Sequence, residues 1–423
     1  MRIPRIHRVG IGMAACAAAV GLAACGDSSG PSTTSTSSGQ SGSSGSVLGT
    51  PKAAQGSPVV FGMINTETNG GANFPEARQA AQATVKYLNA YRGGIDGHPI
   101  KLELCITDAQ PATSAACANK LVASKPVAIL GGTDLAGAVT MPIYKKANLA
   151  YIGGMNFTPA EVKAENSVVF NDAAQSGNAD LGAYAVQKLG AKKVAVIAIG
   201  DTQGKFTAAN GQVPAVQGTG GQAKVFPLPP SQADASPVVA SALAYKPDAI
   251  ILESPSQCVA IINALKALGN AKPVLSIDPC SAPNVIDATS GGTEGVYFFA
   301  PYQLYHGDTA DAKLARAIIE KYAPKTVINS PALQGMNTVM NMWTEFHGTA
   351  VDQLTTDGIL KKLRSGSDHP NFLSTPYTCD GSAVPKYTAI CNAKQFVQQV
   401  KDGKLQQVTS ETYDEGTKYL KTG

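Results

Sequence analysis

Six cysteines fall along the chain as three close pairs. They are Cys105 with Cys117, Cys258 with Cys280, and Cys379 with Cys391. An even number of locally paired cysteines is typical of disulfides formed in an oxidising compartment, and nearest-neighbour pairing closes short loops worth about 3 kcal/mol each. Zinc ligation is the alternative chemistry, but no CxxC or HxxxH spacing occurs and the five histidines are scattered. We therefore predict three disulfides and no metal site.

Catalytic motifs are missing from the segments that would have to carry them. No GxGxxG follows an expected strand, and neither a P-loop nor HExxH occurs. Residues 26–30 fit GxSxG, but they lie in a stretch rich in Gly, Ser and Thr with no strand before it. His98, His306, His347 and His369 have no neighbouring nucleophile pattern, so we expect surface roles for them. The sequence therefore predicts a protein that is not an enzyme and has no cofactor.

Small and polar residues follow almost every apolar run of strand length. At the carboxyl ends of parallel strands, such residues surround the place where open α/β sheets bind ligands. Residues 131–134 and 153–156 are expected to be loops of this kind, and the first exposes backbone N–H groups that suit a carboxylate. Thr133 and Asp134 are equally suited to cap the next helix. Four carboxylates are candidates for a ligand ammonium, with helix capping or exposed loops as alternatives: Glu67, Asp172, Asp201 and Asp278.

The elements that would position these residues begin at residue 58. From there, apolar runs of strand length alternate with amphipathic runs of helix length. In the first unit we expect strands at 58–64, 100–107, 127–130, 149–152 and 168–170, and helices at 74–91, 112–124 and 135–147. In the second unit we expect a helix at 177–189 and strands at 194–199, 223–226, 249–252, 274–277 and 296–300. Later helices at 310–322 and 332–346 suggest a return to the first unit, before hairpins around Asp380 with Gly381 and Asp402 with Gly403. The alternation predicts two α/β units with parallel sheets.

Composition and charge indicate the number of domains and exclude one class of partner. The 423 residues are 44% hydrophobic and 15% charged, enough for two domains with sizeable cores. Arg2, Arg5 and Arg8 precede the expected cleavage point, so the processed chain is close to neutral. Phosphate binding requires clustered Lys and Arg, which the sequence lacks, and nucleic acid is therefore not an expected partner.

The N-terminal segment has the pattern of an export signal. Three Arg and one His precede the uncharged run at 9–24, which is too short to cross a bilayer comfortably. Residues 22–26 (LAACG) resemble the lipobox of bacterial lipoproteins, which implies a signal peptide at 1–24 and a lipid anchor on Cys25. An ordinary cleaved secretory signal is the alternative. Residues 25–57 are then the lipidated Cys and a flexible linker, because a composition so rich in Gly, Ser and Thr cannot offset its ordering entropy.

Several short segments after residue 58 match a known family. They are 73–78 (NFPEAR), 87–90 (YLNA), 93–97 (GGIDG), 99–100 (PI), 131–133 (GGT), 189–194 (LGAKKV), 379–381 (CDG) and 400–404 (VKDGK). Together they resemble type I periplasmic binding proteins, the solute receptors of ABC importers, in the branched-chain amino-acid receptor group. The resemblance implies two Rossmann-like lobes with parallel central sheets joined by a three-strand hinge. Lobe one would comprise 58–175 and 300–366, and lobe two 176–299 and 367–423.

The resemblance also implies which residues hold the ligand. Thr133 and residues 154–156 would bind its carboxylate from lobe one, lobe two would face it with polar side chains, and two aromatic side chains would form apolar walls. With Asp134, the expected set is Phe74, Thr133, Asp134, Gly154, Asn156, Asn171, Asp172, Gln203, Ser256, Asp278 and Tyr302. Residues 154–156 (GMN) and Gln203 depart from the amino-acid receptors, where Ser, Ala or Thr and an aromatic residue are frequent. Amides, urea-like solutes and small aromatic or carboxylic acids therefore remain open as ligands.

The sequence thus predicts a monomeric, extracytoplasmic binding protein anchored to the membrane by a lipid. It would capture a small polar solute, most simply an amino acid, by closure of two lobes, and deliver it to the transmembrane subunits of an ABC permease. A ligand sensor for a signalling receptor is the first alternative. An enzyme of the same outline and a surface lipoprotein without a ligand are the others.

Overall fold

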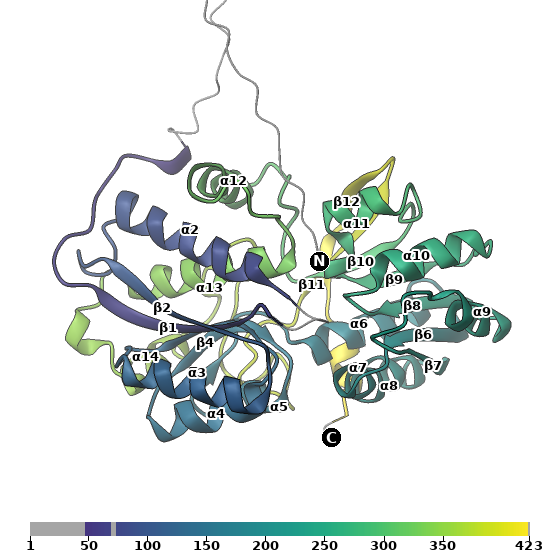
Figure 1. The fold of residues 1–423 in the computed structure, drawn as a ribbon, viewed down its shortest axis with the longest axis horizontal. Coiled ribbons are helices and arrows are strands. Elements are labelled where there is room, and N and C mark those ends of the chain that lie inside the picture. Colours follow the sequence, from purple (N-terminus) through teal and green to yellow (C-terminus); the bar gives the residue numbers. More distant parts are fainter. Residues whose placement is uncertain (1–46, 69–72, 422–423) are drawn as a thin grey trace, which may run out of the picture. The chain divides into compact units, whose positions relative to one another are not determined.

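The structure, a computed structural model, describes residues 47–68 and 73–421. The expected signal peptide, the lipidation site Cys25 and most of the linker lie outside the described residues. The described chain forms two α/β lobes, each built on its own sheet (Figure 1), which confirms the predicted fold class. Within the described ranges, none of the helices has the length and apolar character needed to cross a membrane.

Lobe one is built on a parallel five-stranded sheet in the order β2-β1-β3-β4-β5. Its strands are β1 (Val59–Thr66), β2 (Ile100–Thr107), β3 (Ile129–Asp134), β4 (Tyr151–Asn156) and β5 (Ser167–Val168). Gly131 pairs with Gly153, and a Cβ on Gly131 would lie only 2.6 Å from the Cα of Gly154. This close approach lets β3 and β4 continue through residues 131–134 and 153–156. The prediction that these two segments are loops is therefore wrong, since they are the last residues of two paired strands.

Helices cover both faces of the lobe-one sheet. They are α2 (Pro75–Tyr91), α3 (Pro111–Ala123), α4 (Gly137–Lys146), α5 (Pro159–Lys163), α12 (Ala310–Tyr322), α13 (Ser330–Phe346) and α14 (Thr356–Leu363), with the short η3 (Val351–Gln353). α2, α12 and α13 share one hydrophobic core, while α3 and α4 pack in a second. α13 lies beside α2 (Figure 1) and is buried along most of its length. Trp343 Nε1 on α13 donates a 2.8 Å hydrogen bond to Gly94 O, 249 residues earlier in the chain.

Lobe two is built on a seven-stranded sheet in the order β12-β11-β10-β9-β8-β6-β7. The strands are β6 (Lys193–Ile199), β7 (Gln222–Leu228), β8 (Ala249–Glu253), β9 (Val274–Ile277), β10 (Tyr297–Ala300), β11 (Gln395–Lys401) and β12 (Lys404–Tyr413). β6 to β10 pair in parallel, and β11 and β12 join them antiparallel. Asp402 and Gly403 form the turn between β11 and β12 with φ of 52° and 69°, which confirms the hairpin predicted there.

The helices of lobe two cover its sheet between the strands. They are α6 (Ala174–Gln187), α7 (Thr202–Thr207), α8 (Val213–Gly218), α9 (Ser236–Ala244), α10 (Cys258–Ala267) and α11 (Pro283–Ala288). A π-helical turn, η1 (Ala208–Gln212), joins α7 to α8, and 3-10 turns form η2 (Asp278–Ser281) and η4 (Glu415–Tyr419). The strands of the central parallel part are nearly continuous apolar runs because both faces of the sheet are covered.

The chain passes between the lobes three times. It leaves lobe one after β5, returns to it after β10, and leaves again between α14 and β11. The predicted late return is confirmed, because α12 and α13 pack in the core of lobe one. The residue limits of the lobes stay a prediction, with one difference. Phe372, Leu373 and Tyr377 pack in the lobe-one core, although the sequence assigned them to lobe two.

Residues 47–57 are packed against lobe one, which corrects the expectation that the flexible linker extends to residue 57. Leu48 is only 1% exposed and belongs to the lobe-one core. The backbone of this segment also pairs with the last turn of α2 and with the loop that follows it: Ala54 N donates to Asn89 O and Gln55 N to Gly97 O, both at 2.7 Å. The burial of one leucine and these backbone bonds offset an ordering entropy that the composition alone would not predict.

The structure contains the three disulfides expected from the sequence. They join Cys105 to Cys117, Cys258 to Cys280, and Cys379 to Cys391. The last one begins in the lobe-one core, yet Val384 and Tyr387, inside the loop that it closes, pack in the core of lobe two. This loop forms no hairpin around Asp380 and Gly381, so that prediction is wrong. Its side chains pack on both lobes instead of pairing with one another.

Candidate ligand-binding site

The carboxyl ends of β1, β3 and β4 meet at one edge of the lobe-one sheet, where the sequence predicted contacts to a ligand carboxylate. Thr133 N donates to Asn65 Oδ1 at 2.9 Å, and Gly154 N donates to Thr338 Oγ1 at 3.1 Å. These two backbone donors therefore already have partners within the lobe. Thr133 Oγ1 and Asn156 Oδ1 are buried and have no recorded hydrogen-bond partner among the described residues. The Thr133 hydroxyl is thus the group at this edge that best suits an incoming carboxylate.

Asp134 ends β3 and is held inside lobe one by the start of α4. Its Oδ1 accepts from Ala136 N at 2.9 Å and its Oδ2 accepts from Thr140 Oγ1 at 2.6 Å, and the side chain is fully buried. Burial raises the pKa of this carboxyl. Burial and the nearby Asp134 also raise the pKa of the buried Glu161 carboxyl. Asp134 does not cap α4, whose N-cap is Ala136, but supports its first turn from two residues before, and a ligand contact by Asp134 stays a prediction.

Three more of the predicted residues lie apart from one another. Phe74 is half-buried just before α2, and its carbonyl accepts a 2.8 Å hydrogen bond from Asn65 Nδ2. Gln203 Nε2 on α7 donates to Phe157 O at 2.8 Å, which links lobe two to the segment that follows β4. Ser256 is exposed after β8. None of the three lines the cavity described below.

Four of the predicted residues come together where the chain first leaves lobe one and where it returns. They are Asn171, Asp172, Asp278 and Tyr302, and the last is only 4% exposed. Burial raises the pKa of Asp172 to about 8 and that of Asp278 to about 7. Burial and both carboxyls together raise the pKa of the Tyr302 hydroxyl. Neither aspartate forms an ion pair with a Lys or Arg among the described residues, so no counter-charge within this part of the chain stabilises their ionised forms.

Asp278 and Tyr302 also line a cavity of about 590 Å³. Its other walls come from η2 and α11, from the connection between β10 and α12, from the start of α13 and from the hairpin of β11 and β12. Sequence reasoning missed Gln303, Ser330 and Leu333, which line the same cavity. Tyr302, which follows β10 after Pro301, is the predicted residue that neighbours them, and the aromatic and apolar residues at 302–305 (YQLY) are a signal that could have extended the prediction to Gln303.

A cluster of asparagines holds the first and third crossings against α13. All are 7% exposed or less, and we call them the asparagine cluster: Asn171, Asn337, Asn341, Asn371 and Asn392. Asn171 Nδ2 donates to Asn337 Oδ1 at 3.1 Å, and Asn371 Nδ2 donates to Asn171 Oδ1 at 3.0 Å. Asn337 Nδ2 and Asn341 Nδ2 both donate to Asn371 Oδ1, at 2.8 and 2.7 Å. The cluster fixes the amide of Asn171, which lies beside Tyr302, without using any charged group.

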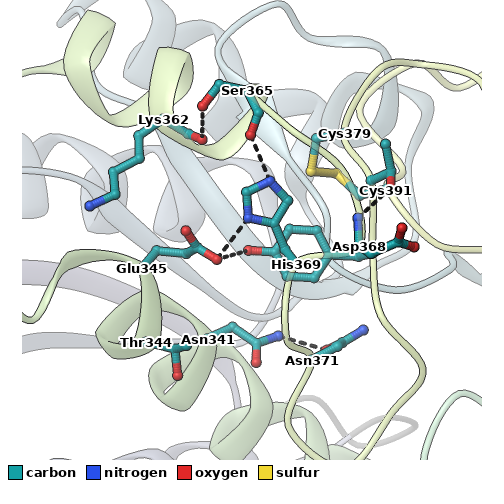
Figure 2. A network of polar contacts seen from close by, with 12 residues as sticks. Asn341, Thr344, Glu345, Lys362, Ser365, Asp368, His369, Asn371, Cys379 and Cys391 are labelled. Carbon is teal, nitrogen blue, oxygen red and sulfur yellow. Dashed lines mark hydrogen bonds and ion pairs between the residues drawn. A yellow bond between two sulfur atoms is a disulfide. The ribbon is translucent and has the colours of Figure 1, made fainter.

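His369 lies in a second polar cluster near the asparagine cluster (Figure 2). Its Nδ1 is 2.9 Å from Glu345 Oε1 and its Nε2 is 2.8 Å from Ser365 O. The Tyr377 hydroxyl donates to the same Glu345 oxygen at 3.1 Å, and the rings of His369 and Tyr377 stack at 5.0 Å. The His369 side chain is 13% exposed. The expectation of a surface role for this histidine is therefore wrong, because it joins α13 to the segment that follows α14.

In the described part of the chain, no group of three or more His, Cys, Asp or Glu side chains is arranged to hold a metal ion. The polar groups around Tyr302 comprise two carboxyls, amides and hydroxyls, which can orient a small solute through hydrogen bonds and charge.

The comparisons with known proteins agree with this architecture. A sequence model described as that of the periplasmic binding protein matches residues 58–402. A curated relative described as an amino acid binding protein, from Pseudomonas aeruginosa PAO1, is 33% identical over 155 residues. That match covers 35% of this chain and only 40% of the length of the relative.

Solved structures of low sequence identity share the fold. The leucine-binding protein LivK from Thermotoga maritima MSB8 matches with a TM-score of 0.67 at 18% identity, over 84% of this chain and 99% of that one. A solute-binding protein of an ABC transporter from R. palustris, in complex with 4-hydroxybenzoate, matches with a TM-score of 0.71 at 16% identity, over 84% and 97% of the two chains. These likenesses establish the two-lobed fold.

Proposed function

We propose that this chain, which belongs to the periplasmic binding protein family, captures a small organic solute that carries an ammonium group, most simply an amino acid. The solute would bind beside Asn171, Asp172, Asp278 and Tyr302, and closure of the two lobes would follow from its contacts to both. The amino acid binding relative and the leucine-binding structure support this class of solute by analogy.

The observation that carries the proposal is the pair of uncompensated carboxyls. Burial raises the pKa of Asp172 to about 8 and of Asp278 to about 7, and no Lys or Arg of the described chain pairs with either. A buried carboxylate without a cation is unfavourable, whereas an ammonium nearby stabilises its charged form. A solute that brings such a group would therefore bind here, and the pKa of each carboxyl would fall when it binds. A ligand with only a carboxylate would have the opposite effect.

Isothermal titration calorimetry measures this difference directly. At pH 7.5 the two carboxyls together hold about one proton, so an ammonium solute should release up to about one proton per molecule bound. We expect the heat of binding to differ between phosphate and Tris buffers by an amount that corresponds to release. Proton uptake, or tight binding of simple carboxylic acids such as benzoate in preference to amino acids, would contradict the proposal.

Three Asp→Asn variants distinguish a direct contact of the two carboxyls with the solute from a general effect of charge on affinity. Asp278→Asn and Asp172→Asn keep the shape of each side chain and should weaken binding of the solute at least tenfold. Asp352→Asn removes an exposed carboxylate far from this site in the sequence and should leave affinity unchanged. Equal affinity of all three variants would mean that neither buried aspartate contacts the ligand.

We also propose that Cys25 carries a lipid anchor and that the bound solute is delivered to an ABC permease. The support is the lipobox-like pattern at residues 22–26, which lies outside the described residues, together with the family. Cys25→Ser should move the protein from the membrane fraction to the soluble fraction of expressing cells. A protein that stays in the membrane fraction after this substitution would refute the anchor. Co-purification of the wild-type protein with permease subunits tests the partner.

A further inference from the structure

The cavity next to Asp278 is larger than an amino acid requires. Its volume of about 590 Å³ lies within the range of about 300–1,000 Å³ typical of pockets for drug-sized ligands. A common α-amino acid fills a minor part of such a space. Something on the solute, or many ordered waters, must therefore occupy the remainder when the site is filled.

The walls of the cavity are mostly apolar. Ile286 on α11, Leu304 and Tyr305 after β10, Ile328 and Leu333 around the start of α13, and Leu405 on β12 all line it. Leu333 is 8% exposed, and the others are half-buried. Apolar walls hold water poorly because water there loses hydrogen bonds, which favours an apolar occupant.

Three residues that line the cavity, Asp278, Gln303 and Ser330, contribute buried polar atoms to it. Asp278 Oδ2 and Gln303 Oε1 are each buried without a hydrogen bond of standard geometry to another described residue. The buried Ser330 hydroxyl lies close enough to the Asp278 carboxyl to counteract part of the rise in its pKa, but it too makes no hydrogen bond of standard geometry. The Gln303 amide oxygen accepts hydrogen bonds, and the Asp278 carboxyl only accepts them once it is ionised, so the matching ligand group is a donor such as an ammonium, which also favours that ionised form. Leaving such atoms unpaired is costly, and a ligand donor would remove that cost. The cavity thus combines a place for a hydrogen-bond donor with apolar walls.

We propose that the solute is an α-amino acid or related amine with an apolar substituent longer than the aliphatic side chains of proteins, and that this substituent lies in the cavity lined by Leu304, Ile328 and Leu333. The inference rests on the proposed function, because it takes the ammonium contact at Asp278 as given. It assigns the role of binding the apolar substituent to residues of the β10–α12 connection and the start of α13.

A homologous series of ligands tests this assignment. We would measure the Kd of L-2-aminobutanoate, L-norleucine, L-2-aminooctanoate and L-2-aminodecanoate by calorimetry, with octanoate as an acid of similar length. Each methylene transferred from water to an apolar wall should tighten binding about fourfold. We expect Kd to fall steadily along the series and octanoate to bind far more weakly than L-2-aminooctanoate.

Two variants place the substituent. Leu304→Ala removes part of the wall and should reduce the gain per methylene, while Ile286→Phe fills the cavity and should weaken the long ligands selectively. Leu268→Phe, at an exposed leucine outside the cavity, is the matched control and should leave the series unchanged. Binding of L-2-aminobutanoate checks that each variant is folded, since that ligand needs little of the cavity.

The outcomes distinguish this inference from the function on which it rests. Equal affinity along the series, with Asp278→Asn still weakening binding, would overturn the apolar substituent and leave the amino-acid receptor intact. A steady gain with chain length that Ile286→Phe does not affect would place the substituent elsewhere and would also overturn the inference. If octanoate binds and no member of the amino-acid series does, the proposed function fails with it.

Discussion

Asn337 on α13 is the member of the asparagine cluster whose removal has the most calculable effect. Its Oδ1 accepts from Asn171 and Asn341, and its Nδ2 donates to Asn371 Oδ1 and to Phe372 O at 2.6 Å. In Asn337→Ala, the Asn341 amide loses its longer 3.3 Å bond to Asn337 but retains the 2.7 Å bond to Asn371, so we do not count it as left without a partner. One hydrogen of the Asn171 amide and the Phe372 carbonyl lose the only partners recorded for them.

Each buried polar group left without a partner costs about 1–3 kcal/mol. Two such groups predict that Asn337→Ala lowers the free energy of unfolding by about 2–6 kcal/mol. Chemical denaturation followed by tryptophan fluorescence is a suitable assay, because Trp343 is the sole tryptophan and lies on the same helix. Asn284→Ala, at an exposed asparagine of α11, should cost less than about 0.5 kcal/mol and serves as the control.

A nearly isosteric variant sharpens this prediction. In Asn337→Asp the second oxygen would face two acceptors, Asn371 Oδ1 and Phe372 O, so the variant should be at least as unstable as Asn337→Ala at pH 7. At acid pH the protonated carboxyl can donate one of the lost hydrogen bonds. The free energy of unfolding of Asn337→Asp should then be higher than that of Asn337→Ala. A loss below about 1 kcal/mol in Asn337→Ala would refute the reasoning, since the amides would then have other partners.

Three further substitutions test other parts of the structure. Leu48→Ala should destabilise lobe one by about 2–5 kcal/mol, as for other buried leucines, and unchanged thermal unfolding would mean that residues 47–57 are not packed there. Glu161→Gln tests a carboxyl whose folded-state pKa is raised above its usual 4.5. The folded chain holds the extra proton, so the wild type should lose stability as pH rises from about 4.5 towards 8, and the variant should be the more stable of the two in denaturation at pH 9 but not at pH 5. Replacing both Cys379 and Cys391 by Ala should cost about 3 kcal/mol in the same denaturation assay, and a smaller loss than about 1 kcal/mol would show that the loop is held by its packing alone.

The sequence predicted most elements because their signals are local. β9 and α12 lie where expected, since apolar periodicity marks each of them, and the turn at Asp402 and Gly403 has a residue pair that favours positive φ. The lengths of β3 and β4 were not predictable in this way. Gly131 and Gly153 indicate a turn when each is read alone, and only their pairing across two strands makes them suited to a sheet.

Only part of the candidate site was predicted, because some of its residues are brought together from distant parts of the chain. Asp278 follows a strand of lobe two, so the rule that ligands bind at strand ends found it, whereas Tyr302 was expected only from the resemblance to the family. Ser330 and Gln303 escaped that rule because they belong to the return of the chain to lobe one. The asparagine cluster also escaped it, since Asn171 and its partner on α13 are 166 residues apart and no local pattern connects them.

The late return of the chain to lobe one has a consequence for how the protein is made. The face of the lobe-one sheet that carries α2 is incomplete until α12 and α13 have been synthesised, and Trp343 can bond to Gly94, 249 positions earlier, only at that stage. A chain delivered from its N-terminus therefore cannot complete the first lobe first, although most domains mature in that order. β6 to β10 follow one another along the chain without a passage through lobe one. This middle segment can therefore fold while the strands of lobe one are still incomplete. During this interval the nascent chains would expose apolar strands. Chaperones would then be needed to prevent these chains from associating with one another.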